Sequence, residues 1–312
     1  MDHVDVIIVG AGITGIYMAS SLIEKGKDVL VMDRSMDLGF PPAGPCFISI
    51  DTYNRYLKDY ESHVNGIFSS ATILGENYEE EIKLEPKNNI VSLDREKLVR
   101  GMAYNLSQKG GKLKIASTIK RIEVKEGRNI VGWIREGRME EISCDSVIIN
   151  TGKIDGEFLF HGGQCKRSNT EAHYVRYIPE KKAEYFTLEF GENHMSVSSS
   201  NGILGEDLNI FSKPREKGII SATSYHIENH TCFPMASSGV FPGGNTMGSE
   251  NYLGRGIEFS LSYNRELVDK IENDWDETNL EMEKYFHEMQ NARNVAGRDL
   301  LETVLYRIPI FS

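Results

Sequence analysis

The chain has 312 residues, of which 40% are hydrophobic, and a formal net charge of −11 at pH 7. This length suits one large α/β domain or two closely joined ones, each with a real core. The acidic surplus argues against nucleic acid as the main partner, because phosphate binding needs a basic face. No apolar run approaches the length of a membrane span, so we expect no transmembrane segment.

The cysteines are widely scattered, and no two of them have CxxC spacing. This usage is typical of reduced thiols in a cytoplasmic protein. The first residues, MDHVDVIIVGAG, lack the basic lead of a signal peptide. We therefore expect a cytoplasmic localisation.

The N-terminus has the pattern strand, glycine turn, helix, strand. Val4–Val9 is a continuous apolar run, which predicts a strand that is buried on both faces. A helix should follow from about Ile13 to Lys25, and Gly26 is suited to close it. The second strand is expected over 28–33. The segment 34–49 is rich in glycine and proline and predicts a long loop.

The middle of the chain alternates between helical and extended patterns. The elements expected there are a helix over 51–60, a strand pair over 69–84, a helix that begins after Asp94, three or four short strands over 112–142, and a separate buried strand over 145–152. Asp94 is a good N-cap residue, and the apolar residues Leu98, Met102 and Leu106 recur at helical spacing behind it.

The last half of the chain begins with mostly alternating short strands over about 153–241, which predicts an antiparallel sheet. A second glycine-rich stretch, 243–256, should open a helix over about 255–273. Two more helices are expected at the end, because apolar residues share one face in each of them.

The strongest functional signal is the motif Gly10-Ala11-Gly12-Ile13-Thr14-Gly15 between the first strand and the first helix. In a dinucleotide-binding turn, Gly10 permits the tight turn, Gly12 lets the backbone approach the pyrophosphate, and Gly15 lets helix and strand pack closely. Asp33 ends the second strand, where a carboxylate accepts hydrogen bonds from ribose hydroxyls and repels the 2′-phosphate of NADP. The alternative is a glycine turn that holds no ligand.

The segment LDREKLVRGMAYNLSQKGGKLKIASTIKRIEV (93–124) follows that motif. Its Asp-Arg, helix, Gly-Gly and strand pair resemble, in this order, the FAD-dependent group that includes aromatic hydroxylases and geranylgeranyl reductases. The resemblance implies FAD as the cofactor and places Arg95 near the flavin-nucleotide phosphates or the ribityl chain. The alternative for Arg95 is a solvated first-turn arginine.

Within this group, two segments resemble the geranylgeranyl reductase branch. They are MDRSMDLGFPPAGPCF (32–47) and FPGGNTMGSENYLGRGIEFSL (241–261). The first implies that Cys46 lies near the flavin, where a thiol can serve as a redox or proton-relay group. The alternative for Cys46 is a small buried apolar residue. The second implies a helix N-terminus that faces the flavin pyrimidine and stabilises negative charge on the reduced ring.

The chain departs from this family at three points. Gly243-Gly244 stands where the family has Gly-Asp, whose aspartate holds the ribityl chain. The aromatic-rich strand signature of the substrate domain is absent, and GENHMSVSSS (191–200) stands near its place. The chain is also shorter than members of the family usually are.

The motif and the resemblance together define the expected site, with Cys46 as the catalytic candidate. The expected cofactor-binding residues are Gly10, Gly12, Ile13, Thr14, Gly15, Asp33, Arg34, Arg95, Ile119, Thr151, Gly152, Gly244, Gly254, Arg255, Gly256 and Ile257. No metal site is expected, because His226, His230 and Cys232 share a presumed strand face but lack a fourth ligand.

These inferences predict an α/β fold, with a Rossmann-like FAD-binding domain and an inserted, mainly antiparallel β substrate domain. The expected FAD domain is 1–152 plus 240–275, the substrate domain is 153–239, and C-terminal helices occupy 276–312. The expected function is an FAD-dependent oxidoreductase that reduces carbon–carbon double bonds of an isoprenoid or lipid.

Two alternatives are a flavin monooxygenase and a diverged flavin- or nucleotide-binding protein without catalysis. The expected partners are a small-molecule or lipid substrate and an unidentified electron donor, with no nucleic acid. Peripheral membrane contact is compatible with a lipid substrate.

Overall fold

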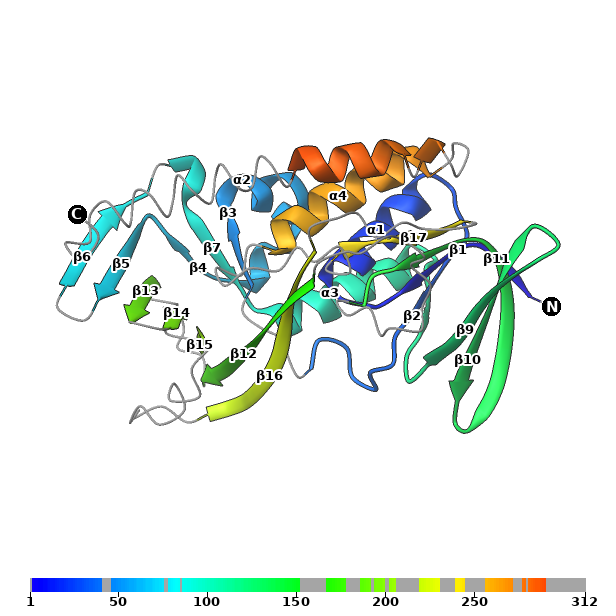
Figure 1. The fold of residues 1–312 in the computed structure, drawn as a ribbon, viewed down its shortest axis with the longest axis horizontal. Coiled ribbons are helices and arrows are strands. Elements are labelled where there is room, and N and C mark those ends of the chain that lie inside the picture. Colours follow the sequence, from blue (N-terminus) through cyan, green and yellow to red (C-terminus); the bar gives the residue numbers. More distant parts are fainter. Residues whose placement is uncertain are drawn as a thin grey trace.

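The protein is described from a computed structural model, and two large sheets dominate it. The structure describes residues 2–40, 46–75, 78–84, 86–151, 167–177, 186–191, 194–199, 202–205, 219–230, 239–244, 256–271, 277–278 and 280–289. Figure 1 shows the two sheets toward opposite ends of the long axis, with helices α1 and α4 packed beside the first of them. In these described ranges, no helix is long and apolar enough to cross a membrane.

The first sheet is parallel at its centre, as the buried apolar runs predict. In the described residues it has seven strands in the order β8-β2-β1-β11-β10-β9, and β17 also pairs with β11. The pairs β8–β2, β2–β1, β1–β11 and β11–β17 are all parallel. The parallel strands are β1 (His3–Val9), β2 (Val29–Met32), β8 (Lys112–Lys114), β11 (Arg138–Ile149) and β17 (Val240–Pro242).

An antiparallel meander extends this sheet through β9 (Thr118–Lys125) and β10 (Arg128–Arg135). Sequence patterning predicted short strands up to 142 and a separate buried strand over 145–152, but the structure has one strand across this junction, β11. The first half of β11 pairs with β10, and its second half pairs with β1 and β17. The polar start of β11 therefore belongs to a solvated ribbon and its apolar end to the buried sheet, which is why the pattern changes along a single strand.

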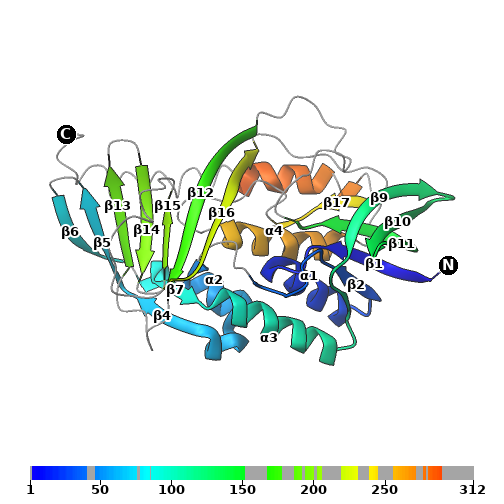
Figure 2. The same ribbon diagram turned by 90° about the horizontal axis from the view of Figure 1, so that it is seen from below.

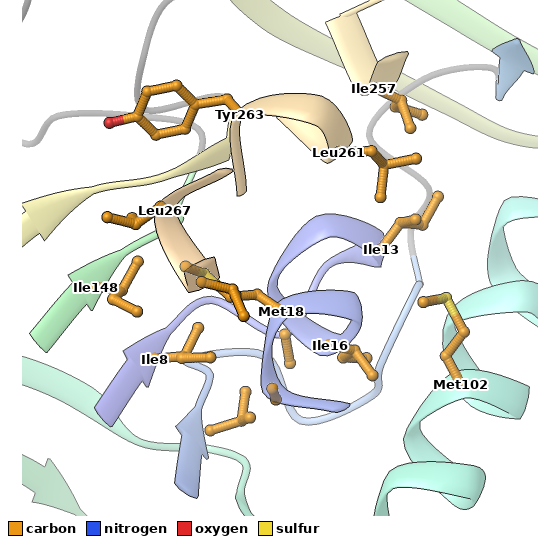
Figure 3. Close-up of a cluster of buried hydrophobic side chains, with 14 of the residues drawn as sticks. Ile8, Ile13, Ile16, Met18, Met102, Ile148, Ile257, Leu261, Tyr263 and Leu267 are labelled. Atoms are coloured by element: carbon orange, nitrogen blue, oxygen red, sulfur yellow. The ribbon is translucent and has the colours of Figure 1, made fainter. Parts of the chain in front are cut away.

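Three helices pack on the same core, namely α1 (Ile13–Glu24), α3 (Arg95–Gln108) and α4 (Gly256–Lys270). Figure 3 shows Ile8 and Ile148 of the sheet near Met18 of α1 and Leu267 of α4. Asp94 caps α3 as predicted, because its side chain accepts the Lys97 N–H. Residues 280–289 form a further helix, in which Phe286 packs edge-on against Phe259 of α4. The last expected helix lies outside the described residues.

The second sheet is mainly antiparallel, as predicted for this part of the chain. Figure 2 shows its strand order β16-β12-β15-β14-β13-β5-β6. Within the described residues, the β13–β5 pair is its parallel pair. The strands are β5 (Ser70–Gly75), β6 (Tyr78–Lys83), β12 (Arg167–Tyr177), β13 (Phe186–Gly191), β14 (His194–Ser199), β15 (Gly202–Gly205) and β16 (Ile219–His230). The expected strand pair 69–84 is thus β5–β6, and it joins this sheet although it lies in the range assigned to the FAD domain. The domain boundaries themselves stay a prediction.

A small third sheet and a run of short helices connect the two larger sheets along the chain. The sheet has the order β3-β7-β4, formed by β3 (Phe47–Ser49), β7 (Ile90–Leu93) and β4 (Val64–Phe68). The helical segment expected over 51–60 is present as α2 (Ile50–Thr52), η1 (Tyr53–Leu57) and η2 (Lys58–His63), and a further single turn is η3 (Pro86–Asn88). The expected loop 34–49 therefore ends in a strand, because Phe47 and Ile48 enter the core.

Candidate dinucleotide-binding site

The candidate site lies where four parallel strands end side by side. After β1, the Gly10 N–H donates to Met32 O at 2.7 Å, and after β11 the Asn150 N–H donates to Val9 O at 2.7 Å. After β17, the Gly243 N–H donates to Ile149 O at 2.8 Å. The chain leaves β1 toward β2 on one side, while β11 lies on the other. This is the topological switch point of an open α/β sheet, where ligands bind outside the carboxyl ends of the strands.

The three glycines of the first turn have different surroundings. Gly10 has φ +112°, and a Cβ there would meet the backbone of Asn150. A Cβ at Gly15 would collide with the carbonyl oxygen of Gly10. Because Gly15 has no side chain, α1 can begin directly against β1. A Cβ at Gly12, in contrast, would meet no atom within 4 Å in the part of the chain that the structure describes. The chain itself therefore needs the first and third glycines, whereas the second faces open space.

The start of α1 has the chemistry of an anion site. Its N-cap is Gly12, so no side chain caps this end, and the first turn contains no acidic residue. The first-turn N–H groups of a helix have no partner within the helix, and the macrodipole adds positive potential there. The open side of Gly12 thus adjoins donors that are suited to phosphate oxygens.

Asp33 is held firmly at the end of β2. Its Oδ2 accepts the Ala11 N–H at 2.7 Å, and its Oδ1 accepts the Ser35 N–H at 2.7 Å. A carboxylate has about four lone-pair positions, so each oxygen keeps capacity for a ribose hydroxyl. The side chain is partly exposed, which leaves it accessible to a ligand. The next residue, Arg34, is exposed.

A buried amide network links the two glycine turns, and sequence analysis missed it. Asn150 Nδ2 donates to Thr14 Oγ1 at 3.0 Å. Asn264 Nδ2 donates to Thr14 O at 3.0 Å and to Asn150 Oδ1 at 3.4 Å. Asn264 Oδ1 accepts the Gly244 N–H at 2.9 Å. Asn264 could have been noticed, because it is a polar residue on the stripe of α4 that also carries Leu261 and Val268.

This network explains why residue 244 is a glycine. Gly244 has φ +53°, and a Cβ there would collide with Asn150 Oδ1 and lie 2.8 Å from Thr14 Oγ1. The carboxamide of Asn150 thus occupies the place that an aspartate side chain would need. The departure from the resembled family is therefore part of a locally consistent arrangement.

The other predicted cofactor residues have varied positions. Ile13 and Ile119 are buried, as are Gly256 and Ile257 at the start of α4, while Thr151 is exposed after β11. Arg95 is half-buried in the first turn of α3. The first turn of α4 is tied to β3, because the Ser49 N–H donates to the Glu258 carboxylate. Gly152, Gly254 and Arg255 lie outside the described residues.

Metal-type side chains approach one another at a different place. Within the described ranges, His3, Asp5 and Asp145 have ligand atoms within 4.8 Å of one another. They lie at the amino end of β1, away from the glycine turn, and Asp5 already accepts the Asp28 N–H. His226 and His230 lie on β16, and Cys232 is outside the described residues. The cluster of His3, Asp5 and Asp145 is separate from the candidate dinucleotide site.

Cys46 lies directly before β3 in the core, and 2% of it is exposed. Burial raises the pKa of its thiol to about 12, although the nearby Arg95 guanidinium acts in the opposite direction. The thiol is therefore protonated near neutral pH, which does not suit a thiolate nucleophile. A catalytic role for Cys46 stays a prediction.

This burial yields an expected result for thiol chemistry. Iodoacetamide at pH 8 should modify Cys46 as slowly as Cys144, because burial raises the pKa of both thiols to about 12. Modification should accelerate only as the pH approaches 12 or when the chain unfolds. Peptide mapping of native and denatured samples by mass spectrometry measures both rates. Fast labelling of Cys46 alone in the native chain would instead show an accessible thiolate beside the site.

Comparisons with known proteins agree with this architecture. A family model described as an NAD(P)-binding Rossmann-like domain matches residues 8–41. A search of curated proteins found no match for the sequence. Solved structures with the same fold are numerous.

Three of the solved structures illustrate the likeness. A geranylgeranyl bacteriochlorophyll reductase-like protein from Thermoplasma acidophilum has a TM-score of 0.69 and 15% identity, over 94% of this chain and 84% of that one. A flavoprotein/dehydrogenase from Cytophaga hutchinsonii has a TM-score of 0.70 and 11% identity, over 95% and 86%. The p-nitrophenol 4-monooxygenase of Pseudomonas putida has a TM-score of 0.72 and 11% identity, over 92% and 87%.

These likenesses establish the fold for nearly the whole chain. They include a protein described as reductase-like in the branch that sequence resemblance favoured. At 11–15% identity they assign no substrate. The α/β architecture, with a Rossmann-like parallel sheet and a mainly antiparallel second sheet, is the predicted one.

Proposed function

We propose that this chain is an FAD-dependent oxidoreductase. One observation carries the proposal: the open side of Gly12 lies between the uncapped N-terminus of α1 and the fixed carboxylate of Asp33. Donors for a pyrophosphate and an acceptor for a ribose thus lie at one switch point. The residues present fit a dinucleotide without rearrangement of the turn.

FAD is favoured over a nicotinamide dinucleotide for two reasons. The resemblance of 93–124 is to FAD-dependent enzymes, and the structural relatives include proteins described as a flavoprotein/dehydrogenase and as a monooxygenase. The chain also returns to the site through β17 and α4, so that a second glycine turn and Asn264 of α4 lie beside the first turn of α1. The Asp33 carboxylate disfavours the 2′-phosphate of NADP.

Each part of the chain has a task in this proposal. The N-terminus of α1 binds the pyrophosphate, and Asp33 orients the adenosine ribose. The start of α4 stabilises negative charge that develops on the bound ring. Bound FAD supplies the hydride chemistry. The second sheet would cover the ring of bound FAD, exclude water and contact the substrate.

We propose reduction of a carbon–carbon double bond in an isoprenoid or other lipid as the reaction. The support is the resemblance of 32–47 and 241–261, together with the reductase-like structural relative. A flavin monooxygenase is the second candidate, because a structure described as a 4-monooxygenase matches at a TM-score of 0.72. The reductase reaction needs an alkene as electron acceptor and proceeds without oxygen, whereas the monooxygenase reaction needs oxygen.

An anaerobic half-reaction experiment separates these candidates. The FAD-loaded protein is photoreduced, and flavin absorbance is then followed after addition of isoprenoid alkenes without oxygen, or of oxygen with aromatic substrates. Reoxidation by an alkene supports the reductase. Substrate-dependent reoxidation by oxygen with hydroxylated product supports the monooxygenase. Reoxidation at the rate of free FAD in every mixture would contradict both enzymes and indicate a binding protein.

The role of Asp33 can be tested by comparing two aspartates of one loop. Asp33→Ala should raise the Kd for FAD about 10- to 100-fold, because a hydrogen bond to a charged group contributes about 1.5–3 kcal/mol. Asp37→Ala removes the same charge from an exposed ion pair with Arg100 and should leave the Kd within about twofold. Titration followed by fluorescence measures both. Equal affinities in the two variants would show that Asp33 does not contact the ribose.

A further inference from the structure

We propose that Asn264 is a positioning residue for the cofactor cradle. Its carboxamide joins the first glycine turn to the turn at Gly243–Gly244, so FAD affinity should depend on a side chain whose polar atoms are all bound to protein. The inference rests on the proposed FAD site and adds to it a residue that lies outside every recognised motif.

Asn264 is completely buried, and each polar atom of its side chain is paired. None of the residue is exposed. Its two N–H donors go to Thr14 O and Asn150 Oδ1, and its oxygen accepts the Gly244 N–H. A buried amide is strongly unfavourable unless it is hydrogen-bonded in this way. The side chain therefore has one orientation, because a flipped amide would direct Nδ2 at an N–H and Oδ1 at two oxygens.

The Asn264 amide lies where three separate segments of the chain meet. Thr14 belongs to the first turn of α1, Asn150 follows β11, and Gly244 follows β17. These segments lie far apart in sequence, and they meet at the switch point. Asn150 tightens the junction through Thr14 Oγ1, and its Oδ1 fills the space beside Gly244. The network thus joins the two turns directly by hydrogen bonds.

The Asn264 amide also determines which backbone N–H groups remain for the ligand. The Gly244 N–H is taken by Asn264, so the second turn cannot offer it to a phosphate. Among the described residues, no side chain caps the first turn of α1 in this way. Asn264 therefore holds the second turn in place, while α1 binds the anion. Loss of the amide should disturb both, because the Gly244 N–H would be buried without its Asn264 partner and Thr14 O would lose the donor that ties it to α4.

The test compares Asn264→Leu with Leu267→Ala. Leucine has the same branching at Cγ and cannot form hydrogen bonds, whereas Leu267 is equally buried on the same helix and lies outside the network. Asn264→Leu should raise the Kd for FAD at least about tenfold. Leu267→Ala should lower the denaturant midpoint but leave the Kd of the folded protein within about twofold. A Kd for Asn264→Leu within about twofold of the unaltered chain would overturn the proposal.

The pH dependence of FAD binding by Asn264→Asp distinguishes a positioning role from a purely structural one. The introduced carboxyl can donate to one oxygen and accept the Gly244 N–H when it is protonated, but it repels Thr14 O and Asn150 Oδ1 when it is ionised. Those atoms and the Gly244 N–H are its polar neighbours in the described residues, and none of them titrates. The ratio of variant Kd to unaltered Kd should therefore be near one at pH 5 and rise at pH 8.

The Asn264→Asp variant also tests the proposal if Asn264→Leu does not fold. A ratio that is independent of pH would overturn the proposal. Absence of FAD binding by the unaltered chain would contradict the proposed function itself and would be seen before any variant is compared.

Discussion

Replacement of Gly12 by valine should leave the chain folded but unable to retain FAD. A Cβ at this position would meet no atom of the described residues within 4 Å, and the N-cap backbone has φ −76°, which valine adopts without strain. The valine would instead fill the space into which the pyrophosphate must come. We expect a loss of affinity of at least about a hundredfold, together with an unfolding midpoint close to that of the unaltered apoprotein.

The measurement pairs flavin content after purification with thermal unfolding of the apoprotein. Gly12→Ala is the graded control, because one methyl group should weaken FAD binding less than valine does. A Gly12→Val protein with full flavin content would show that the cofactor does not approach this turn. A protein that fails to fold would show that the space beside Gly12 is needed by the chain itself.

Replacement of Gly15 by alanine should have the opposite effect and destabilise the fold. Gly15 lies in the first turn of α1, and alanine is ordinarily the better helix former by up to about 1 kcal/mol. Here the added Cβ would collide with Gly10 O and lie 2.8 Å from Asn150 Nδ2. Because backbone cannot move aside as a side chain does, we expect a loss of about 3 kcal/mol or more in the free energy of unfolding.

The matched control is Gly101→Ala in α3. The nearest obstacle at Gly101 is the imidazole of His63, a side chain that can turn away. Chemical denaturation of the two apoproteins should therefore give a much larger loss for Gly15→Ala. Equal stabilities would show that α1 does not depend on close contact with β1.

The N-terminal unit could be predicted from sequence because its signals are local. A buried apolar run, three spaced glycines and a terminal aspartate each have one structural meaning when they occur in this order. In the structure, Gly15 packs against Gly10, and Asp33 accepts the Ala11 N–H of the same turn, as that pattern requires. The helix after Asp94 was equally predictable, since its cap and its apolar spacing agree.

The partners of β5 and the role of Asn264 could not be predicted in this way. The pairing of β5 with β13 joins residues 72–74 to 187–189, and no local pattern encodes a strand partner so far along the chain. Asn264 matters because three other segments arrive beside it, which is a property of the fold and not of its own sequence window. Sequence reasoning also treated Gly244 as a missing aspartate, whereas the structure shows a position that Asn150 has filled.

The central claim is that the switch point beside Gly12 and Asp33 binds FAD. The most direct test is titration of the apoprotein with FAD and, separately, with NAD, followed by calorimetry and by the visible spectrum of the complex. The account predicts saturation at about one FAD per chain, with a perturbed flavin spectrum and much weaker binding of NAD. Tight binding of NAD with no binding of FAD, or binding of neither, would contradict it.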